Sequence, residues 1–330
     1  MKKLSSQIAL RAATIAGSLL LVAATGQAQA QQGAYPNHTI KLIVGFAPGG
    51  IADTIGRVVG QAISESLKQP VIVENRGGAS GAIATKAVIN APADGYTILV
   101  NTTAMPINEA AGTGQGVSLG RDLVALSISA ITPELLAVSS KSTVTSLAQL
   151  VEEARKKNGI AYATAGAGTA SHIAAEYLFR SLKLNASHVP HKGGAPALNA
   201  VTGGHIELLS ISMPAATPHV LSGSLRGLAI GAPQRSPALP DVPTGAELGF
   251  KAYNFTSWVG FFAASKTPPE VVTLLNREIN KALQNKVILE RLQKIGFAAN
   301  VADVPATAKM LDAEIVKWKE AVAVAGFGKK

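Results

Sequence analysis

The sequence contains no cysteine. This absence excludes disulfide bonds, thiolate metal sites, cysteine nucleophiles and the lipidated cysteine of a lipoprotein. Aromatic residues make up only 5% of the chain, too few for a surface on which nucleic-acid bases stack. Beyond Ala30, no apolar segment reaches the length that a membrane-spanning helix needs. We therefore expect a soluble mature protein that does not bind nucleic acid.

Acidic residues are outnumbered, with 20 Asp and Glu against 30 Lys and Arg. The cations are scattered and form only short clusters such as Arg155-Lys156-Lys157. Such a distribution is typical of a solvated basic surface that mildly attracts anions, not of a nucleic-acid groove.

The first thirty residues have the pattern of a signal peptide. Basic residues, an apolar stretch and a small-x-small sequence follow one another: Lys2, Lys3 and Arg11, then Ala12–Ala24, then Ala28-Gln29-Ala30. The apolar stretch is short for a membrane span and rich in small residues. We predict cleavage after Ala30 and export to the periplasm. The remaining chain, from Gln31, is longer than one hydrophobic core usually organises, which favours two lobes.

Short β-branched runs alternate with helical spacings of apolar residues, the pattern of an α/β protein. Strands are predicted at 41–44, 71–73, 96–100 and 162–164. Helices are predicted after Gly50, after the capping box Ser146–Gln149, and after Thr267-Pro268-Pro269-Glu270. The glycines of Ala110–Gly116 indicate a loop.

Two glycine-rich turns, Gly45–Gly50 and Gly166–Ser171, each lie between a predicted strand and a predicted helix. The first N–H groups of a helix lack internal partners and carry partial positive charge, so such an end can bind a carboxylate or phosphate. Thr169 and Ser171 add hydroxyl groups. Asp53 either favours the helix dipole or orders the loop and rejects over-charged ligands. Turns of this kind also occur for tight geometry alone.

The motifs of common enzymes are missing from these turns. A phosphate-binding P-loop needs a lysine where Ile51 stands, and a dinucleotide-binding turn needs a third glycine where Ser171 stands. The sequence has no Gly-x-Ser-x-Gly nucleophile elbow. We predict no catalytic residue and no cofactor.

The six histidines do not form a recognisable metal site. His188 and His191 are three residues apart, but Pro190 between them disfavours a shared helical face, and no carboxylate is near. We predict no metal site. His172, beside the second glycine-rich turn, has two open interpretations: it donates to a bound carboxylate, or it packs and caps locally.

The stretch Gly45–Asp53 resembles the "P-F-x-P-G-G-x-x-D" signature of the Bug receptors, the solute-binding proteins of tripartite tricarboxylate transporters. Further segments are similar to that family in the same order and cover essentially all of the mature chain: 73–76, 94–97, 166–176, 189–193, 239–244, 258–260 and 267–268.

The resemblance implies a type II periplasmic-binding-protein fold, with two α/β lobes joined by two crossover strands and a ligand cleft between them. The first lobe would comprise residues 31–132 and 256–330, and the second residues 133–255, with exchanges near Thr132 and Thr256. The loops Phe46–Asp53 and Thr164–His172 would face each other. The expected ligand-binding residues are Phe46, Ala47, Pro48, Gly49, Gly50, Asp53, Thr102, Thr164, Gly166, Gly168, Thr169, Ser171, His172 and Ser212.

The implied function is capture of a small mono- or dicarboxylate by a monomeric periplasmic receptor, which delivers it to integral-membrane permease subunits. An exported ligand-sensing receptor for a signalling partner is the alternative; an exported hydrolase would need a nucleophile–base pair or paired carboxylates. The chain departs from the family pattern at His191, at Ser210 and Ile211, and in Ala110–Gly116. We expect these departures to affect ligand specificity.

Overall fold

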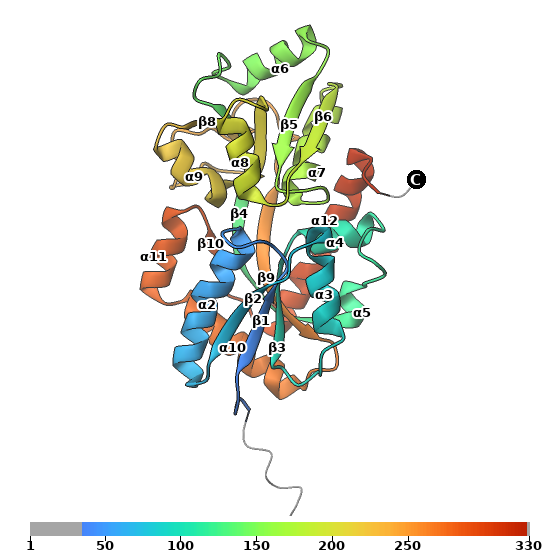
Figure 1. The fold of residues 1–330 in the computed structure, drawn as a ribbon, viewed down its shortest axis with the longest axis vertical. Coiled ribbons are helices and arrows are strands. Elements are labelled where there is room, and N and C mark those ends of the chain that lie inside the picture. The colour runs from blue at the N-terminus through green and yellow to red at the C-terminus, as the bar shows by residue number, and fades with distance from the viewer. Residues whose placement is uncertain (1–34, 329–330) are drawn as a thin grey trace, which may run out of the picture. The chain divides into compact units, whose positions relative to one another are not determined.

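The computed structural model describes residues 35–328, so the predicted signal peptide and its cleavage site lie outside the described residues. The chain divides after Asn37, and the unit His38–Lys330 contains every helix and strand given below. Within this unit the strands form two sheets, each flanked by helices (Figure 1).

The first sheet has the strand order β2-β1-β3-β9-β4, with a short β10 paired to β4. Its strands are β1 (Ile40–Val44), β2 (Val71–Asn75), β3 (Thr97–Thr102), β4 (Leu123–Ser139), β9 (Thr256–Ala264) and β10 (Ala298–Ala299). β1, β2 and β3 are parallel, whereas β9 is antiparallel to both of its neighbours. β1 is almost wholly apolar because its central position leaves little of it exposed.

The second sheet is built on the far half of β4, which pairs with β7 and with β8. Its other strands are β5 (Ile160–Thr164), β6 (Ala186–Pro190), β7 (Leu208–Ser212) and β8 (Leu225–Ile230). β5 is parallel to both β6 and β7. Each sheet with its helices forms one lobe.

The helices follow the apolar spacings of the sequence. Those of the first lobe are α2 (Ile51–Leu67), α3 (Ala82–Ile89) after the 3₁₀ turn η1 (Ala79–Gly81), α4 (Ala104–Ala110), α5 (Leu119–Asp122), α10 (Pro269–Leu283) and α11 (Lys286–Lys294). Those of the second lobe are α6 (Leu147–Lys156), α7 (Ala170–Ser181), α8 (Gly194–Thr202) and α9 (Met213–Leu221). The predicted cap of α6 is confirmed, since the Ser146 hydroxyl accepts from the Gln149 N–H at 3.2 Å.

β4 and β9 connect the lobes. β4 pairs with β9 as far as Pro133 opposite Thr256, and then continues into the second sheet. The Glu134 N–H donates to the Phe255 carbonyl at 3.0 Å, and the Gly231 N–H donates to the Glu134 carbonyl at 2.8 Å. We call the segment where residues 132–134 face residues 256–257 the strand crossing.

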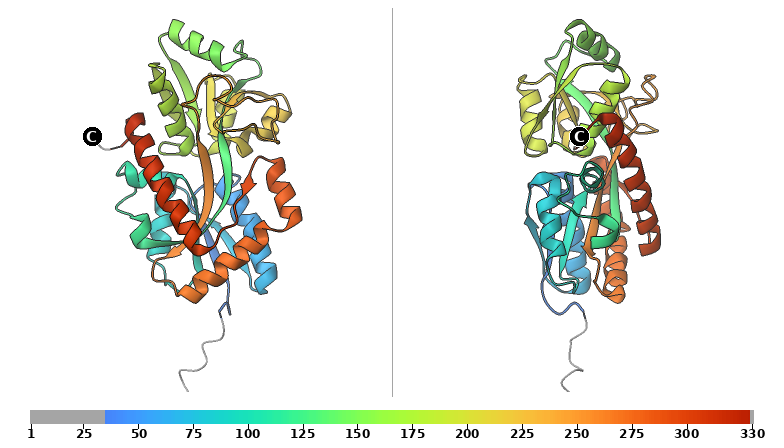
Figure 2. Two further views of the ribbon diagram at one scale, coloured as in Figure 1. Left: turned by 180° about the vertical axis from the view of Figure 1, so that it is seen from behind. Right: turned by 90° about the vertical axis from the view of Figure 1, so that its right-hand side faces the viewer.

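The last helix, α12 (Val304–Ala325), runs along both lobes (Figure 2). Its Leu311 belongs to the first-lobe core, whereas Trp318 and the residues after it pack in the second-lobe core with α7. The side chain of Glu314 accepts from both indole N–H groups, that of Trp258 in β9 at 2.9 Å and that of Trp318 at 2.8 Å. The last turns of α12 thus pack against the second lobe. The predicted boundaries, which place 256–330 in the first lobe, stay a prediction.

Candidate functional site

A cavity of about 100 Å³ lies between the two lobes. Its walls are the β1–α2 loop, the end of β3, the start of α7, the β6–α8 loop and the β7–α9 turn, together with Glu134 and Ser257 at the strand crossing. The cavity brings together many of the residues expected to bind ligand: Phe46, Ala47, Pro48, Gly49, Gly50, Thr102, Thr169, Ser171 and Ser212.

The start of α2 lines this cavity through Gly50, Ile51 and Ala52. Gly50 is the N-cap residue and has extended backbone (φ −77°, ψ 171°), and it has no side chain to cap the first N–H groups of the helix. Gly49 has φ +82°, a conformation that glycine adopts without strain. The first N–H groups of the helix, at Ile51 and Ala52, have no acceptor inside it, and a helix of 17 residues adds its dipole to them, so an anion is stabilised here.

Asp53 does not line the cavity, but its hydrogen bonds hold the β1–α2 loop in place. Its carboxylate accepts from the Gly49 N–H, the Asn75 amide and Arg57, each at 2.9 Å. Asn75 also donates to the Phe46 carbonyl at 3.0 Å, which fixes the loop at its other end. Burial raises the pKa of Asp53, but the hydrogen bonds from Arg57, Gly49 and Asn75 outweigh it, so the pKa is lowered and the group is ionised. Of the two sequence interpretations, the contacts fit an ordering role.

The start of α7 lines the cavity with a second set of polar groups. Thr169 is the N-cap residue, and its hydroxyl donates to the Gly166 carbonyl at 2.7 Å and accepts weakly from the His172 N–H at 3.4 Å. The Ser171 hydroxyl lies 3.0 Å from that of Thr169. α7 has 12 residues, so its dipole also favours an anion in the cavity.

His172 packs locally and does not line the cavity. Its Nδ1 accepts from the Gly168 N–H at 3.2 Å, and its ring stacks on that of His188 with centroids 3.9 Å apart. Phe327, beyond the last helix, contacts the ring edge-on at 5.0 Å. Burial lowers the pKa of His172 to about 4, so the ring is neutral near neutral pH. The arrangement matches the second of the two interpretations left open by the sequence.

Three other expected residues also lie outside this cavity. The Thr164 hydroxyl contacts His188 Nε2 at 2.7 Å, and Gly168 packs against Asn108 and Phe327. Gly166 lines an adjoining cleft of about 480 Å³, together with His191, one of the departures from the family pattern. Asp53, Thr164, Gly166, Gly168 and His172 thus do not line this cavity, and direct contact of these five with a ligand stays a prediction.

Sequence reasoning missed Glu134, Ser257 and Lys192, all of which line the cavity. Glu134 is 1% exposed, and its Oε1 accepts from the Ser257 hydroxyl. Burial raises the pKa of Glu134 to about 7, although the Ser257 hydrogen bond lowers it. One signal was present, because Glu134 is the sole charged residue in the apolar strand Leu123–Ser139.

The two lobes touch beside the cavity. The Ser80 hydroxyl of the first lobe donates to the Ala167 carbonyl of the second at 2.5 Å. A Cβ atom on Gly193 would lie 3.8 Å from that of Ala47, so the β6–α8 and β1–α2 loops are in van der Waals range. The cavity thus lies between facing loops of the two lobes.

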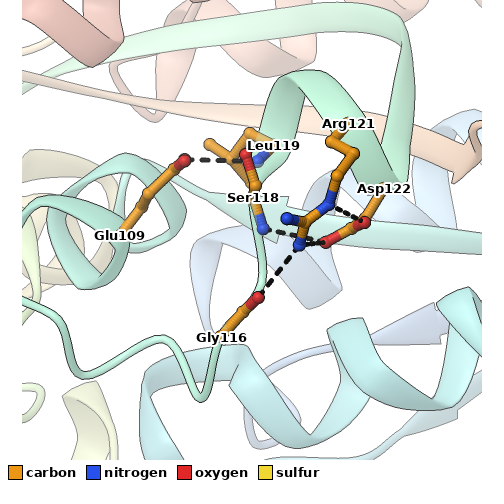
Figure 3. Close-up of polar contacts among 6 residues, drawn as sticks. All are labelled: Glu109, Gly116, Ser118, Leu119, Arg121 and Asp122. Atoms are coloured by element: carbon orange, nitrogen blue, oxygen red, sulfur yellow. Dashed lines mark hydrogen bonds and ion pairs between the residues drawn. The ribbon is translucent and has the colours of Figure 1, made fainter.

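The departures from the family pattern fall in different places. Ile211 lines the cavity, and the Ser210 hydroxyl supports it by donating to the Ser171 carbonyl at 2.8 Å. The Ala110–Gly116 loop does not line the cavity. It is held by its own neighbours: Ser118 N–H donates to Asp122 at 2.9 Å, Leu119 N–H to Glu109 at 3.2 Å and Arg121 to the Gly116 carbonyl at 3.2 Å (Figure 3).

Within residues 35–328, no group of three or more His, Asp or Glu side chains is arranged to hold a metal ion. No helix in the same range is both long enough and apolar enough to cross a membrane.

Comparisons with known proteins agree over most of the chain. The profile of a family described as "Tripartite tricarboxylate transporter family receptor" matches residues 55–327. Protein BugT of Bordetella pertussis is 35% identical over 297 residues, which are 88% of this chain and 90% of that protein.

Solved structures show the same architecture. The periplasmic binding protein BugD aligns with a TM-score of 0.83 at 28% identity, over 90% of this chain and 100% of that one. An R. palustris protein solved with adipate aligns with a TM-score of 0.85 at 30% identity, over 89% of this chain and 99% of that one. MatC from Rhodopseudomonas palustris with bound malate aligns with a TM-score of 0.81 at 28% identity, over 87% of this chain and 100% of that one. The predicted two-lobed α/β fold class is confirmed by these alignments.

Proposed function

Because the chain belongs to the receptor family of tripartite tricarboxylate transporters, whose members are solute-binding proteins and not enzymes, we propose that it binds a small mono- or dicarboxylate in the interlobe cavity. It then delivers this ligand to the integral-membrane permease subunits of a transporter.

The observation that carries this proposal is the convergence of two helix starts on one cavity. Gly50 begins α2 in the first lobe and Thr169 begins α7 in the second, and both line the cavity. A carboxylate between them is stabilised by free N–H groups and by two helix dipoles. Adipate and malate, the ligands of two similar structures, belong to the same chemical class.

The binding residues in this proposal are those expected residues that line the cavity. Phe46, Ala47, Pro48, Gly49, Gly50 and Thr102 hold the ligand from the first lobe, and Thr169, Ser171 and Ser212 hold it from the second. Asp53 keeps the first loop in shape. Residues 133–255 form most of the second lobe, and closure about the strand crossing encloses the ligand.

The proposed location is the periplasm, which the chain reaches by a signal peptide cleaved after Ala30. The protein acts there as a monomer. A receptor that docks on a signalling protein would share this fold and cavity, so a pull-down with the permease subunits distinguishes the two functions.

The test is to release bound ligand from natively purified protein by denaturation and to identify it by mass spectrometry. Isothermal titration calorimetry with that compound then measures the affinity before and after chelator treatment. We expect a small carboxylate whose binding is unaffected by the chelator. A ligand without a carboxylate, or a strict metal requirement, would contradict the proposal.

A further inference from the structure

Glu134 places an acid in the wall of a cavity that otherwise favours anions. Its backbone is held on both sides at the strand crossing, and its side chain is 1% exposed. The Oε1 atom accepts from Ser257, whereas Oε2 is buried and has no hydrogen-bond partner among residues 35–328. An unpartnered buried oxygen is costly, and a charged one is more so.

Among residues 35–328, no charged or titratable group forms an ion pair with Glu134. Lys192 lines the same cavity from the β6–α8 loop, and Asp53 of α2 lies outside it. Tyr253, on the chain before β9, is fully buried, and burial and Glu134 raise its pKa well above the ordinary value. β7 and α9 contribute only the uncharged Ile211, Ser212 and Ala215.

These contacts define where a proton on Glu134 resides. A neutral carboxyl group has one O–H donor, and its other oxygen accepts. Since Oε1 already accepts from Ser257, the proton lies on Oε2. The last torsion of a glutamate side chain is soft, so the carboxyl group turns toward a ligand oxygen without moving the backbone.

We propose that Glu134 binds the ligand as a neutral acid, with Oε2–H donating to a ligand carboxylate, so that capture of the anion requires one proton on this side chain. This inference rests on the proposed function. An ionised Glu134 would repel a carboxylate in a cavity of low dielectric constant. An ionised Glu134 would favour only a ligand that carries a positively charged group, such as the ammonium group of an amino acid.

The proposal fixes the sign of the pH dependence. The neutral form binds, and its fraction falls as pH rises through the pKa of about 7. The affinity should therefore be level below pH 6, weaken about tenfold between pH 6 and pH 8, and weaken about tenfold again by pH 9. Binding at pH 8 should take up nearly one proton per ligand, and binding at pH 6 should take up almost none.

The experiment uses the tightest binder from a panel of two- to eight-carbon mono- and dicarboxylates. Calorimetry at pH 6, 7, 8 and 9, in buffers of different ionisation enthalpy, measures both affinity and proton uptake. Glu134→Gln replaces the O–H donor with an N–H donor of similar shape and cannot ionise. We expect it to bind at all four pH values within about threefold of wild-type protein at pH 6, without proton uptake.

Glu278→Gln is the matched control. Glu278 is also buried, 5% exposed, but it lies on α10 and accepts from Ser66 outside the cavity. This variant should keep the wild-type pH profile.

Three results overturn the inference. A wild-type affinity that does not vary with pH would show that binding requires no proton. A Glu134→Gln variant with the wild-type pH dependence of affinity would show that the proton is not on Glu134. Loss of binding in Glu134→Gln together with proton release in the wild type identifies an ionised Glu134 that accepts from a cationic ligand group. Failure of every carboxylate to bind at every pH is distinct, because it contradicts the proposed function itself.

Discussion

Gly50→Val is the sharpest test of the binding loop. Gly50 lines the cavity, and its backbone is extended, so valine adopts the same conformation without strain. A Cβ atom there would meet only the Ala47 carbonyl oxygen, at 3.5 Å, which is an ordinary contact. The branched side chain therefore fits the fold but occupies the approach to the first N–H groups of α2.

The expected magnitude follows from the hydrogen bonds that are lost. A hydrogen bond to a charged group contributes about 1.5–3 kcal/mol, so loss of one such bond weakens carboxylate binding about 10- to 150-fold. Glycine is a better N-cap residue than valine, and the change should cost about 1 kcal/mol of stability. In a chain of this size that corresponds to a fall of about 2–4 °C in Tm.

Calorimetry with the identified ligand measures the affinity, and thermal denaturation without ligand measures the stability. Gly120→Val is the matched control, because Gly120 lies in the exposed part of α5 with no atom within 4 Å of an added Cβ. It should bind normally. If Gly50→Val also binds normally while remaining folded, the start of α2 does not hold the ligand, and the site has been placed wrongly.

Three further substitutions test the surroundings of the cavity. Gly168 has φ +74°, and an added Cβ would lie 2.8 Å from Asn108 Oδ1. Gly168→Ala should therefore lower the free energy of unfolding, measured in urea, by about 2 kcal/mol. Unchanged stability would show that the site accepts a side chain. The folded-state pKa of Asp53 is lowered, so the wild-type protein should be more stable than Asp53→Asn near neutral pH and should lose this advantage as pH falls below about 4. Thermal melts over this pH range measure the difference. A difference in Tm that does not change with pH would contradict the ion pair with Arg57. The pKa of His172 is lowered to about 4 from its ordinary 6.5, so the stability of the wild-type protein in thermal melts should decrease as the pH falls from about 6.5 to about 4. His172→Gln should lose less stability over the same pH range. Equal losses in the two proteins would contradict this prediction.

Local sequence signals predicted the features that local chemistry determines. The starts of α2, α6 and α7 were predicted from Gly50, from Ser146 and from the turn Gly166–Ser171, because a helix start depends on residues within one turn. The order of short motifs along the chain also predicted the family and the fold class, and both are confirmed.

Features that depend on distant contacts could not be predicted. Glu134 and Ser257 are 123 positions apart and meet only because of the pairing between β4 and β9. His172 has a neutral, buried ring because His188 and Phe327 close over it, from segments that its own sequence neighbours do not specify. Gly50 and Gly168 look alike in sequence, yet an added side chain would enter the cavity at the first and clash with the fold at the second.

The shared carboxylate of Glu314 has a spectroscopic consequence. The protein has two tryptophans, and both indole N–H groups donate to this one side chain. Trp258 belongs to the first-lobe core and Trp318 to the second-lobe core. All of the tryptophan fluorescence therefore originates where β9 and α12 join the two lobes. Emission intensity and wavelength, followed during a ligand titration, therefore report changes around the contact between β9 and α12 without any attached label.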